Sequence, residues 1–341
     1  MAEQASETDV AIIGTGPVGL FAVFELGMLE MRTVLIDALA DPGGQCAALY
    51  PEKPIYDIPG YPRIAAGELI AQLKEQARPF APEFRLGRCV TGLAERSGGG
   101  WRLRDDHGDV LDAKAVVIAA GGGAFGPNRP PLPGIEIYEG RSVHYSVGRR
   151  EDFRGKRLVI AGGGDSAVDW ALSLAGLAAR IYVVHRRQRF RAAPDSVSRL
   201  HTLAAAGEGV ELVIPYQLAG LEGRDGRLEA VEVATLEGEK RRLEADALLA
   251  FFGLAMELGP LADWGLEIER GQIIINPATA ESSRPGIFAV GDIAGYPGKL
   301  KLILTGFAEA AQAAHAIHRI VYPQRALHFE YSTMKGVPGR E

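Results

Sequence analysis

The chain has 341 residues, of which 47% are hydrophobic and 23% charged, with a formal net charge of −6 at pH 7. This length can hold two domains with cores of their own, and the composition is typical of a soluble globular protein. The acidic balance argues against nucleic acid as the main partner, and no apolar stretch is long enough to span a membrane. Residues 1–9 are polar and lack an apolar signal core, so a cytoplasmic location is expected.

The first predicted strand, residues 10–13, leads into a glycine-rich turn and then a helical pattern starting near Pro17. Such a turn between strand and helix brings backbone amides close to a pyrophosphate. A second run, residues 33–36, ends in Asp37, where a carboxylate accepts hydrogen bonds from the ribose hydroxyls of FAD or NAD. The contacts predicted from this turn and acid are Gly14, Thr15, Gly16, Pro17, Gly19 and Asp37.

A loop rich in Gly, Pro and Tyr is predicted over residues 40–62, and a helix over 66–76. Strand-like runs separated by glycine turns follow at 84–93, 101–105 and 110–120. The proline-rich segment 126–134 cannot continue a helix or lie centrally in a sheet, so it is interpreted as a linker to a second domain.

The second half repeats this plan. An apolar run, residues 158–161, enters a second glycine turn, and the next run, 181–184, ends in His185-Arg186-Arg187. Arginines at this position pair with the 2′-phosphate of NADPH, whereas the alternative is a solvated basic edge. The predicted NADPH contacts are Gly162, Gly164, Asp165, Ser166, Arg186, Arg187 and Arg191.

Three further strand-like runs are predicted at 210–218, 228–234 and 242–252. The chain then returns near residues 253–260, forms a strand at 286–290 that ends in Gly291-Asp292, and closes with a helix over 305–321. We therefore predict an α/β fold of two Rossmann-like dinucleotide-binding domains, each with an added antiparallel meander. The FAD domain is predicted to be discontinuous, residues 1–124 and 254–341, and the NADPH domain to comprise residues 125–253.

Four segments, 43–45, 117–121, 185–192 and 286–292, resemble the thioredoxin-reductase-like flavoproteins, and the likeness runs along nearly the whole chain. Thioredoxin reductase itself carries a redox Cys-x-x-Cys just before its NADPH glycines. Residues 143–149 stand at that place here and contain no cysteine, and the two cysteines of the chain, Cys46 and Cys89, are far apart in sequence. Because dithiol exchange needs two sulfurs, thioredoxin reduction is excluded.

Segments 49–57, 298–307 and 329–336 are similar to a narrower group, the thioredoxin-reductase-like ferredoxin/flavodoxin–NADP⁺ reductases. The resemblance implies a homodimer in which Tyr50 stacks on one flavin face and Tyr331 of the partner subunit on the other, with no acid–base residue required. It further implies FAD contacts at Asp37, Gly44, Gln45, Tyr50, Val90, Phe125, Asp292 and Thr333.

The predicted function is therefore electron transfer between NADP(H) and ferredoxin or flavodoxin through FAD. A local positive patch would dock an acidic carrier, with Lys53, Arg63, Lys299 and Lys301 as candidates. Tyr138-x-Gly140-x-x-x-His144 partly matches a motif of NADPH-dependent flavin monooxygenases, but Gly148 stands where that motif has an aromatic residue. Two other classes stay open: an NADPH oxidase or disulfide-reductase-like enzyme with another acceptor, and a non-catalytic NADP(H) sensor.

Overall fold

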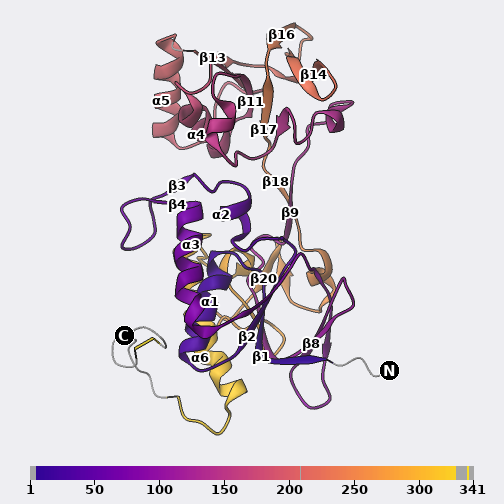
Figure 1. Cartoon of the computed structure of the whole chain (residues 1–341), viewed down its shortest axis with the longest axis vertical. Helices are drawn as coiled ribbons and strands as arrows, with labels where there is room; N and C mark the ends of the chain where they lie inside the picture. The colour runs from indigo at the N-terminus through magenta and orange to yellow at the C-terminus, as the bar shows by residue number, and fades with distance from the viewer. Residues whose placement is uncertain (1–4, 208, 328–335, 338–341) are drawn as a thin grey trace. The chain divides into compact units, whose positions relative to one another are not determined.

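The computed structural model describes residues 5–207, 209–327 and 336–337. The chain forms two compact units, the first made of residues 1–125 and 256–341 and the second of residues 126–255 (Figure 1). Each unit has its own cluster of buried apolar side chains.

The first unit is built on a seven-stranded sheet in the order β5-β2-β1-β8-β7-β6, with β21 also paired to β8. The pairs from β5 to β8 and from β8 to β21 are parallel, whereas β8, β7 and β6 form an antiparallel meander. Residues 10–12 of β1 are buried and all apolar, as expected for a central parallel strand covered on both faces. The strands are β1 Ser6–Ile13, β2 Thr33–Asp37, β5 Glu83–Leu86, β6 Val90–Glu95, β7 Trp101–Asp105, β8 Val110–Ile118 and β21 Ile287–Ala289.

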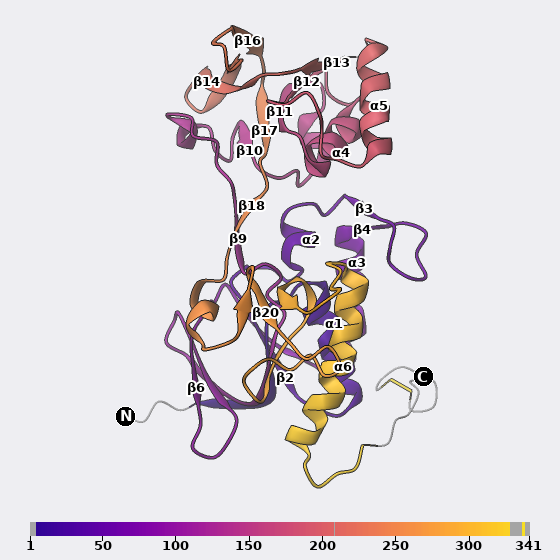
Figure 2. The same cartoon turned by 180° about the vertical axis from the view of Figure 1, so that it is seen from behind.

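Three helices, α1 (Pro17–Met28), α3 (Ala66–Ala77) and α6 (Ile303–Val321), lie side by side in this unit (Figures 1 and 2). Helix α1 packs between the other two, which explains why its sequence is apolar on most sides. Pro17 occupies its first turn, where a missing N–H costs nothing. Strand β21 pairs with β8 and helix α6 packs on α1, so the C-terminal segment adds a strand to the first sheet and a helix to its helical layer.

Short elements complete the first unit and join it to the second. Strands β3 and β4 pair as a hairpin, and β19, β20 and β22 form a small sheet. Strands β9 and β18 pair with each other and carry the chain out of the first unit and back into it. The bounds are α2 Gly44–Ala48, β3 Pro54–Ile55, β4 Ile64–Ala65, β9 Ala124–Pro127, β18 Leu254–Glu257, β19 Ile268–Glu269, β20 Gln272–Ile274 and β22 Ala294–Gly295.

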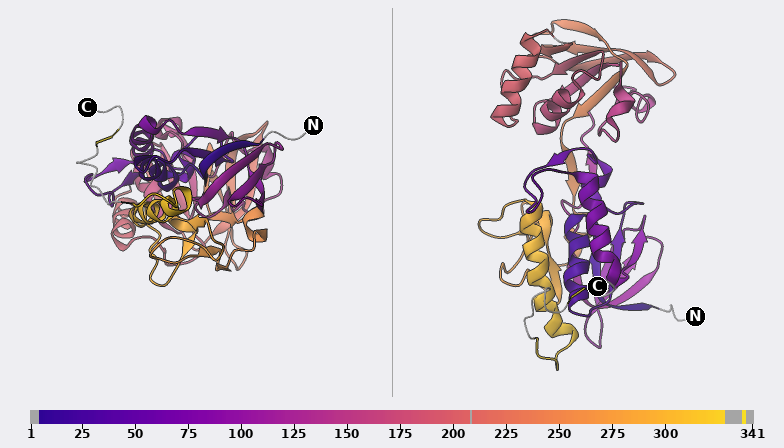
Figure 3. Two further views of the ribbon diagram at one scale, coloured as in Figure 1. Left: turned by 90° about the horizontal axis from the view of Figure 1, so that it is seen from below. Right: turned by 60° about the vertical axis from the view of Figure 1, so that its left-hand side comes forward.

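The second unit has a five-stranded parallel sheet in the order β10-β17-β11-β12-β13, and a separate antiparallel sheet, β14-β15-β16. Figure 3 shows the ribbon of this unit from two further sides. Helices α4 and α5 pack on each other and on the parallel sheet. The predicted class of two Rossmann-like halves with added meanders is confirmed. The bounds are β10 Val143–His144, β11 Arg157–Gly162, α4 Asp165–Leu174, β12 Arg180–Val184, α5 Pro194–Ala205, β13 Val210–Val213, β14 Gln217–Arg224, β15 Arg227–Ala234, β16 Lys240–Glu244 and β17 Ala247–Phe251.

Three predicted strand-like runs were wrong in the same way, because each contains two strands that belong to different ladders. The run 84–93 is β5 at the parallel edge and β6 in the meander, and it breaks at Gly87, whose φ is +64°. The runs 210–218 and 242–252 likewise divide into β13 with β14 and β16 with β17. The predicted loop 40–62 also contains a short helix, α2.

Candidate functional site

The first glycine turn connects β1 to α1 and packs against the chain that leaves β8. Gly14 has a φ of +105°, and a Cβ there would lie 2.4 Å from the Ala119 carbonyl oxygen, so only glycine fits. A Cβ on Gly19 would lie 2.1 Å from the Gly14 carbonyl oxygen, so the helix needs glycine for its close approach to the turn. A Cβ on Gly16 would meet nothing within 4 Å. Gly16 therefore leaves open space beside the helix N-terminus, where a phosphate can approach backbone amides.

Asp37 lies at the carboxyl end of β2, next to this turn. Its Oδ2 accepts hydrogen bonds from the backbone amide and the hydroxyl of Thr15, both at 2.6 Å, and its Oδ1 accepts one from the Leu39 amide at 2.9 Å. A carboxylate has about four acceptor positions, so Asp37 can still accept from a ribose hydroxyl. Thr15 is fully buried, and its contribution is to hold the Asp37 carboxylate in place.

A cavity of about 300 Å³ lies along the carboxyl ends of the parallel strands in the first unit. This is the edge at which open α/β sheets bind their ligands. Most of the predicted flavin contacts line it. They are Gly14, Gly16, Pro17, Asp37, Gly44, Gln45, Tyr50, Val90 and Asp292.

The remaining predicted flavin contacts are not among the described residues that line the cavity. Thr15 and Gly19 support its wall from behind. The side chain of Phe125 is not described, and Tyr331 and Thr333 lie outside the described residues, so their flavin contacts stay predictions. The cavity also has lining residues that sequence reasoning missed, among them Arg88 and Trp264.

The sequence around Arg88 carries no motif that would place this residue at the cavity, because its position depends on partners distant in sequence. Its guanidinium pairs with Asp105 at 2.9 Å and with Asp109, and its amide donates to the Asp37 carbonyl oxygen at 2.9 Å. The turn after β5 thus places a fixed cation at the Asp37 end of the cavity.

Tyr50, the predicted flavin-stacking residue, is half-buried at the opposite end of the α2 segment from Gly44. Its hydroxyl lies 4.0 Å from the Cys46 Sγ. Burial, with a smaller contribution from the Asp292 charge, raises the pKa of the Cys46 thiol to about 11. Burial also raises the pKa of the Tyr50 phenol. Cys46 is therefore a neutral thiol at physiological pH and no thiolate nucleophile.

The Gly291-Asp292 turn is held from behind by a buried carboxylate on α6. Glu309 accepts a hydrogen bond from the Gly291 amide at 2.8 Å and one from the Tyr296 hydroxyl at 2.7 Å, and it pairs with Lys299. The Lys299 side chain is only 4% exposed. Lys299 is thus not available to dock an acidic carrier, whereas Arg63 and Lys301 are exposed.

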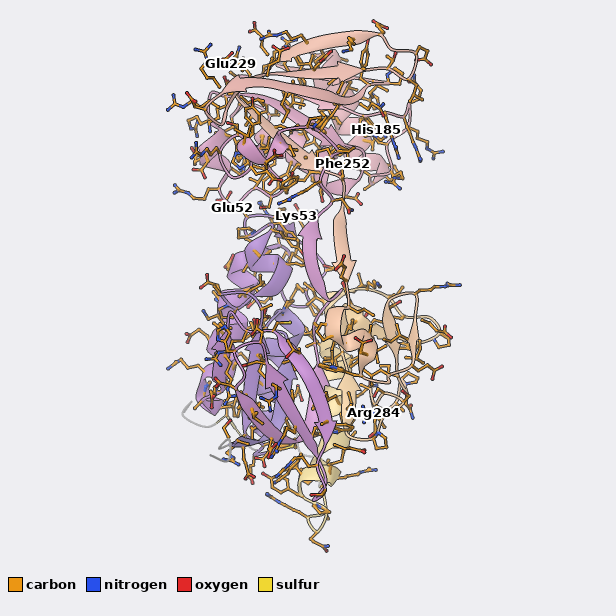
Figure 4. All side chains as sticks on the ribbon, turned by 90° about the vertical axis from the view of Figure 1, so that its right-hand side faces the viewer. Glu52, Lys53, His185, Glu229, Phe252 and Arg284 are labelled. Carbon is orange, nitrogen blue, oxygen red and sulfur yellow. The ribbon has the colours of Figure 1, made fainter. Side chains whose placement is uncertain are left out.

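The second glycine turn connects β11 to α4 in the other unit. A Cβ on Gly163 would lie 2.0 Å from the His185 ring, so the glycine makes room for the imidazole, whereas a Cβ on Gly164 would meet nothing within 4 Å. His185, labelled in Figure 4, stacks on Phe190 with ring centroids 5.1 Å apart. Burial lowers the pKa of His185, and the neighbouring arginine charges lower it further.

The arginine-bearing loop after β12 is tied to this glycine turn by its backbone. The Arg191 amide donates to the Gly163 carbonyl oxygen at 2.7 Å, and the Ala193 amide donates to Asp165 Oδ1 at 2.9 Å. The side chains of Arg186, Arg187 and Arg191 are exposed, and within the described part of the chain they form no ion pair. Asp165, predicted to contact NADPH, thus positions the loop, and the arginines are free to receive an anion.

No cluster of potential metal ligands occurs among the described residues, and none of the described helices is long and apolar enough to cross a membrane. Two nucleotide-binding turns, one followed by a carboxylate and one by arginines, define a two-domain pyridine-nucleotide-dependent oxidoreductase. The chain belongs to the pyridine nucleotide-disulphide oxidoreductase family, which matches residues 8–316.

Curated relatives cover almost the whole chain. A protein of Granulibacter bethesdensis named ferredoxin–NADP reductase is 65% identical over 98% of this chain and 95% of its own length. One of Acidiphilium cryptum with the same name is 63% identical over 99% of both chains. Among solved structures, thioredoxin reductase of Lactococcus lactis superposes with a TM-score of 0.77 at 29% identity, covering 93% of this chain and 99% of that one.

Proposed function

We propose that the chain is an FAD-dependent reductase that transfers electrons between NADP(H) and a ferredoxin or flavodoxin. The observation that carries this proposal is the near-full-length identity of 60–65% to several proteins named ferredoxin–NADP reductase. The absence of a Cys-x-x-Cys in the sequence supports it over thioredoxin reduction, because dithiol exchange needs two sulfurs on the enzyme.

The residues of the first unit fit a flavin dinucleotide. Gly16 opens the helix N-terminus to the pyrophosphate, Asp37 offers a carboxylate to the ribose, and Tyr50 and Asp292 line the far part of the same cavity. Bound FAD would supply the exchange between two-electron and one-electron chemistry, and no acid–base side chain is needed for it. The protein then acts by holding and orienting the cofactor and by setting its electrostatic surroundings.

The residues of the second unit fit NADP(H). The exposed guanidiniums of Arg186 and Arg187 follow the strand that ends next to the glycine turn, where an adenosine 2′-phosphate is bound in this kind of fold. The backbone bonds from Arg191 and Ala193 fix the loop before ligand arrives, which reduces the ordering cost of binding. We further propose a homodimer in which Tyr331 of the partner subunit covers the flavin.

An anaerobic titration tests the proposal. NADPH is added to the yellow protein and flavin absorbance is followed near its visible maximum, after which oxidised ferredoxin or flavodoxin is added in separate samples. We expect bleaching, followed by reduction of at least one carrier. Bleaching with electron delivery only to oxygen or to a disulfide would favour the alternative acceptors, and an FAD that NADPH does not bleach would favour the sensor.

A further inference from the structure

We propose that the buried Glu309–Lys299 pair is a positioning and charge-balancing device for the flavin end of the cavity. The inference rests on the proposed flavin binding and goes beyond it, because it assigns a role to two residues that do not line the cavity. Glu309 and Lys299 position Gly291 and the segment that follows it, and as a neutral pair they keep a net charge away from the cofactor.

The contacts of Glu309 join a residue of the cavity wall to the loop that precedes α6. Its Oε2 accepts a hydrogen bond from the amide of Gly291, which lines the cavity next to Asp292. Its Oε1 accepts hydrogen bonds from the Tyr296 hydroxyl and the Lys299 ammonium, and both of these residues lie in the loop that precedes α6. The Lys299 ammonium also lies 5.4 Å from the centroid of the Tyr296 ring. One carboxylate therefore fixes both the Gly291-Asp292 turn and the loop leading to Ile303, another lining residue.

Close packing leaves no freedom for this turn to move independently of α6. A Cβ on Gly306 would lie 2.4 Å from a Val18 methyl group and 3.1 Å from the Gly291 Cα, so the first turn of α6 touches both the turn and α1. Val18 is itself a lining residue. The position of Glu309 on α6 is thus transmitted directly to the cavity wall.

The pair is a poor device for stability alone. The side chains of Lys299 and Glu309 are 4% and 3% exposed, and taking both charges out of water costs about as much as their attraction returns. Apolar residues of similar volume would fill this space at no loss of stability. A buried pair does offer two opposite charges, held in place by hydrogen bonds, behind the wall of the cavity proposed to bind the flavin, whose own charge changes on reduction.

Separating the two charges gives opposite predictions for the flavin. In Glu309→Gln the Lys299 charge stays buried without its counter-charge, which favours the reduced, more negative flavin and raises the midpoint potential. In Lys299→Met the Glu309 charge stays unpaired and lowers the potential. At an effective dielectric constant of about 20, a unit charge about 12 Å away changes an affinity ratio by about tenfold, and we take this factor as the expected change in the ratio of oxidised to reduced flavin affinities. For a two-electron couple this ratio corresponds to about 30 mV.

The experiment measures midpoint potential by equilibrium titration, flavin dissociation and thermal unfolding of the full-length protein. The variants are Glu309→Gln, Lys299→Met and the double variant, which is neutral again. Tyr296→Phe removes a hydrogen bond to the same carboxylate without changing charge, and Lys301→Met removes an exposed charge two residues from Lys299. We expect the midpoint potential to shift in opposite directions in the two single variants. In the double variant the ratio of oxidised to reduced flavin affinities should return to within about threefold of the wild-type ratio. Both controls should leave the midpoint potential close to that of the wild type, because neither changes a buried charge.

The inference would be overturned if the midpoint potentials of the two single variants shifted in the same direction, or if they did not shift in variants that retain flavin. If the single variants fail to retain flavin, recovery of flavin binding in the double variant supports charge balance, and a double variant that also fails overturns it. A wild-type protein that holds no flavin would overturn the proposed function and this inference together. Flavin binding by the wild type thus separates failure of the inference from failure of the function.

Discussion

Neutralising the two arginines after β12 should remove the preference for NADPH. The perturbation is the double variant Arg186→Gln with Arg187→Gln. A hydrogen bond to a charged group contributes about 1.5–3 kcal/mol, and we take the lower value because both side chains are exposed and screened by solvent. Two such bonds give about 3 kcal/mol, which is a factor of about 10² in the ratio of NADPH to NADH efficiency. The loop is already fixed by its backbone bonds, so the loss should reflect the phosphate contacts themselves.

The assay compares kcat/KM for NADPH and NADH in steady-state carrier reduction. We expect the loss to fall on KM for NADPH, with KM for NADH nearly unchanged and a smaller difference at high salt. Arg189→Gln is the matched control, because Arg189 is exposed in the same loop and was not predicted to contact the phosphate. An unchanged NADPH-to-NADH ratio in the double variant, or an equal loss in the control, would refute the reasoning.

Three further predictions concern the glycine turn, the pH dependence and carrier docking. Gly164→Ala adds a methyl group into the open space beside the turn, so it should raise KM for NADPH about tenfold without changing the free energy of unfolding. In Gly163→Ala the added methyl group meets the His185 ring, so urea unfolding should show a loss of about 1–3 kcal/mol in stability. Equal stability of the two variants would contradict this. Burial lowers the pKa of His185, so the unfolded chain binds more protons below about pH 6.5 and the unfolding free energy should fall between pH 7 and 5. Urea unfolding across that range should show a shallower slope for His185→Asn, and a wild-type profile that is flat would count against it. Lys301→Glu reverses an exposed charge two residues before Ile303, which lines the cavity, and should raise KM for ferredoxin by roughly threefold at low salt. Stopped-flow measurement should show that flavin reduction by NADPH is unchanged.

Local sequence was sufficient to predict the parts of the site that depend on backbone. A glycine turn between strand and helix, with Asp37 or Arg186 one strand later, has a geometry that follows from the βαβ unit alone. The fold class followed for the same reason, because the plan occurs twice.

Contacts between distant residues could not be predicted in this way. Glu309 looks like any polar position on α6 until the structure brings it against Gly291 and Lys299. Lys299 was accordingly assigned to the surface by its charge, although its side chain is buried. The run 84–93 was misassigned for a related reason. Its pattern predicts strand, but it does not show that β5 and β6 pair with different neighbours at opposite edges of the same sheet.

The discontinuous first unit has a consequence for the order in which the protein folds during synthesis. The cavity is lined by residues near position 14 and also by Asp292 and Ile303, so its wall is incomplete until nearly the whole chain has left the ribosome. The second unit is one continuous segment, residues 126–255, and can fold while the first still lacks β21 and α6. Flavin capture is therefore expected as a late event, after the nucleotide-binding segment in the middle of the chain has already formed its core.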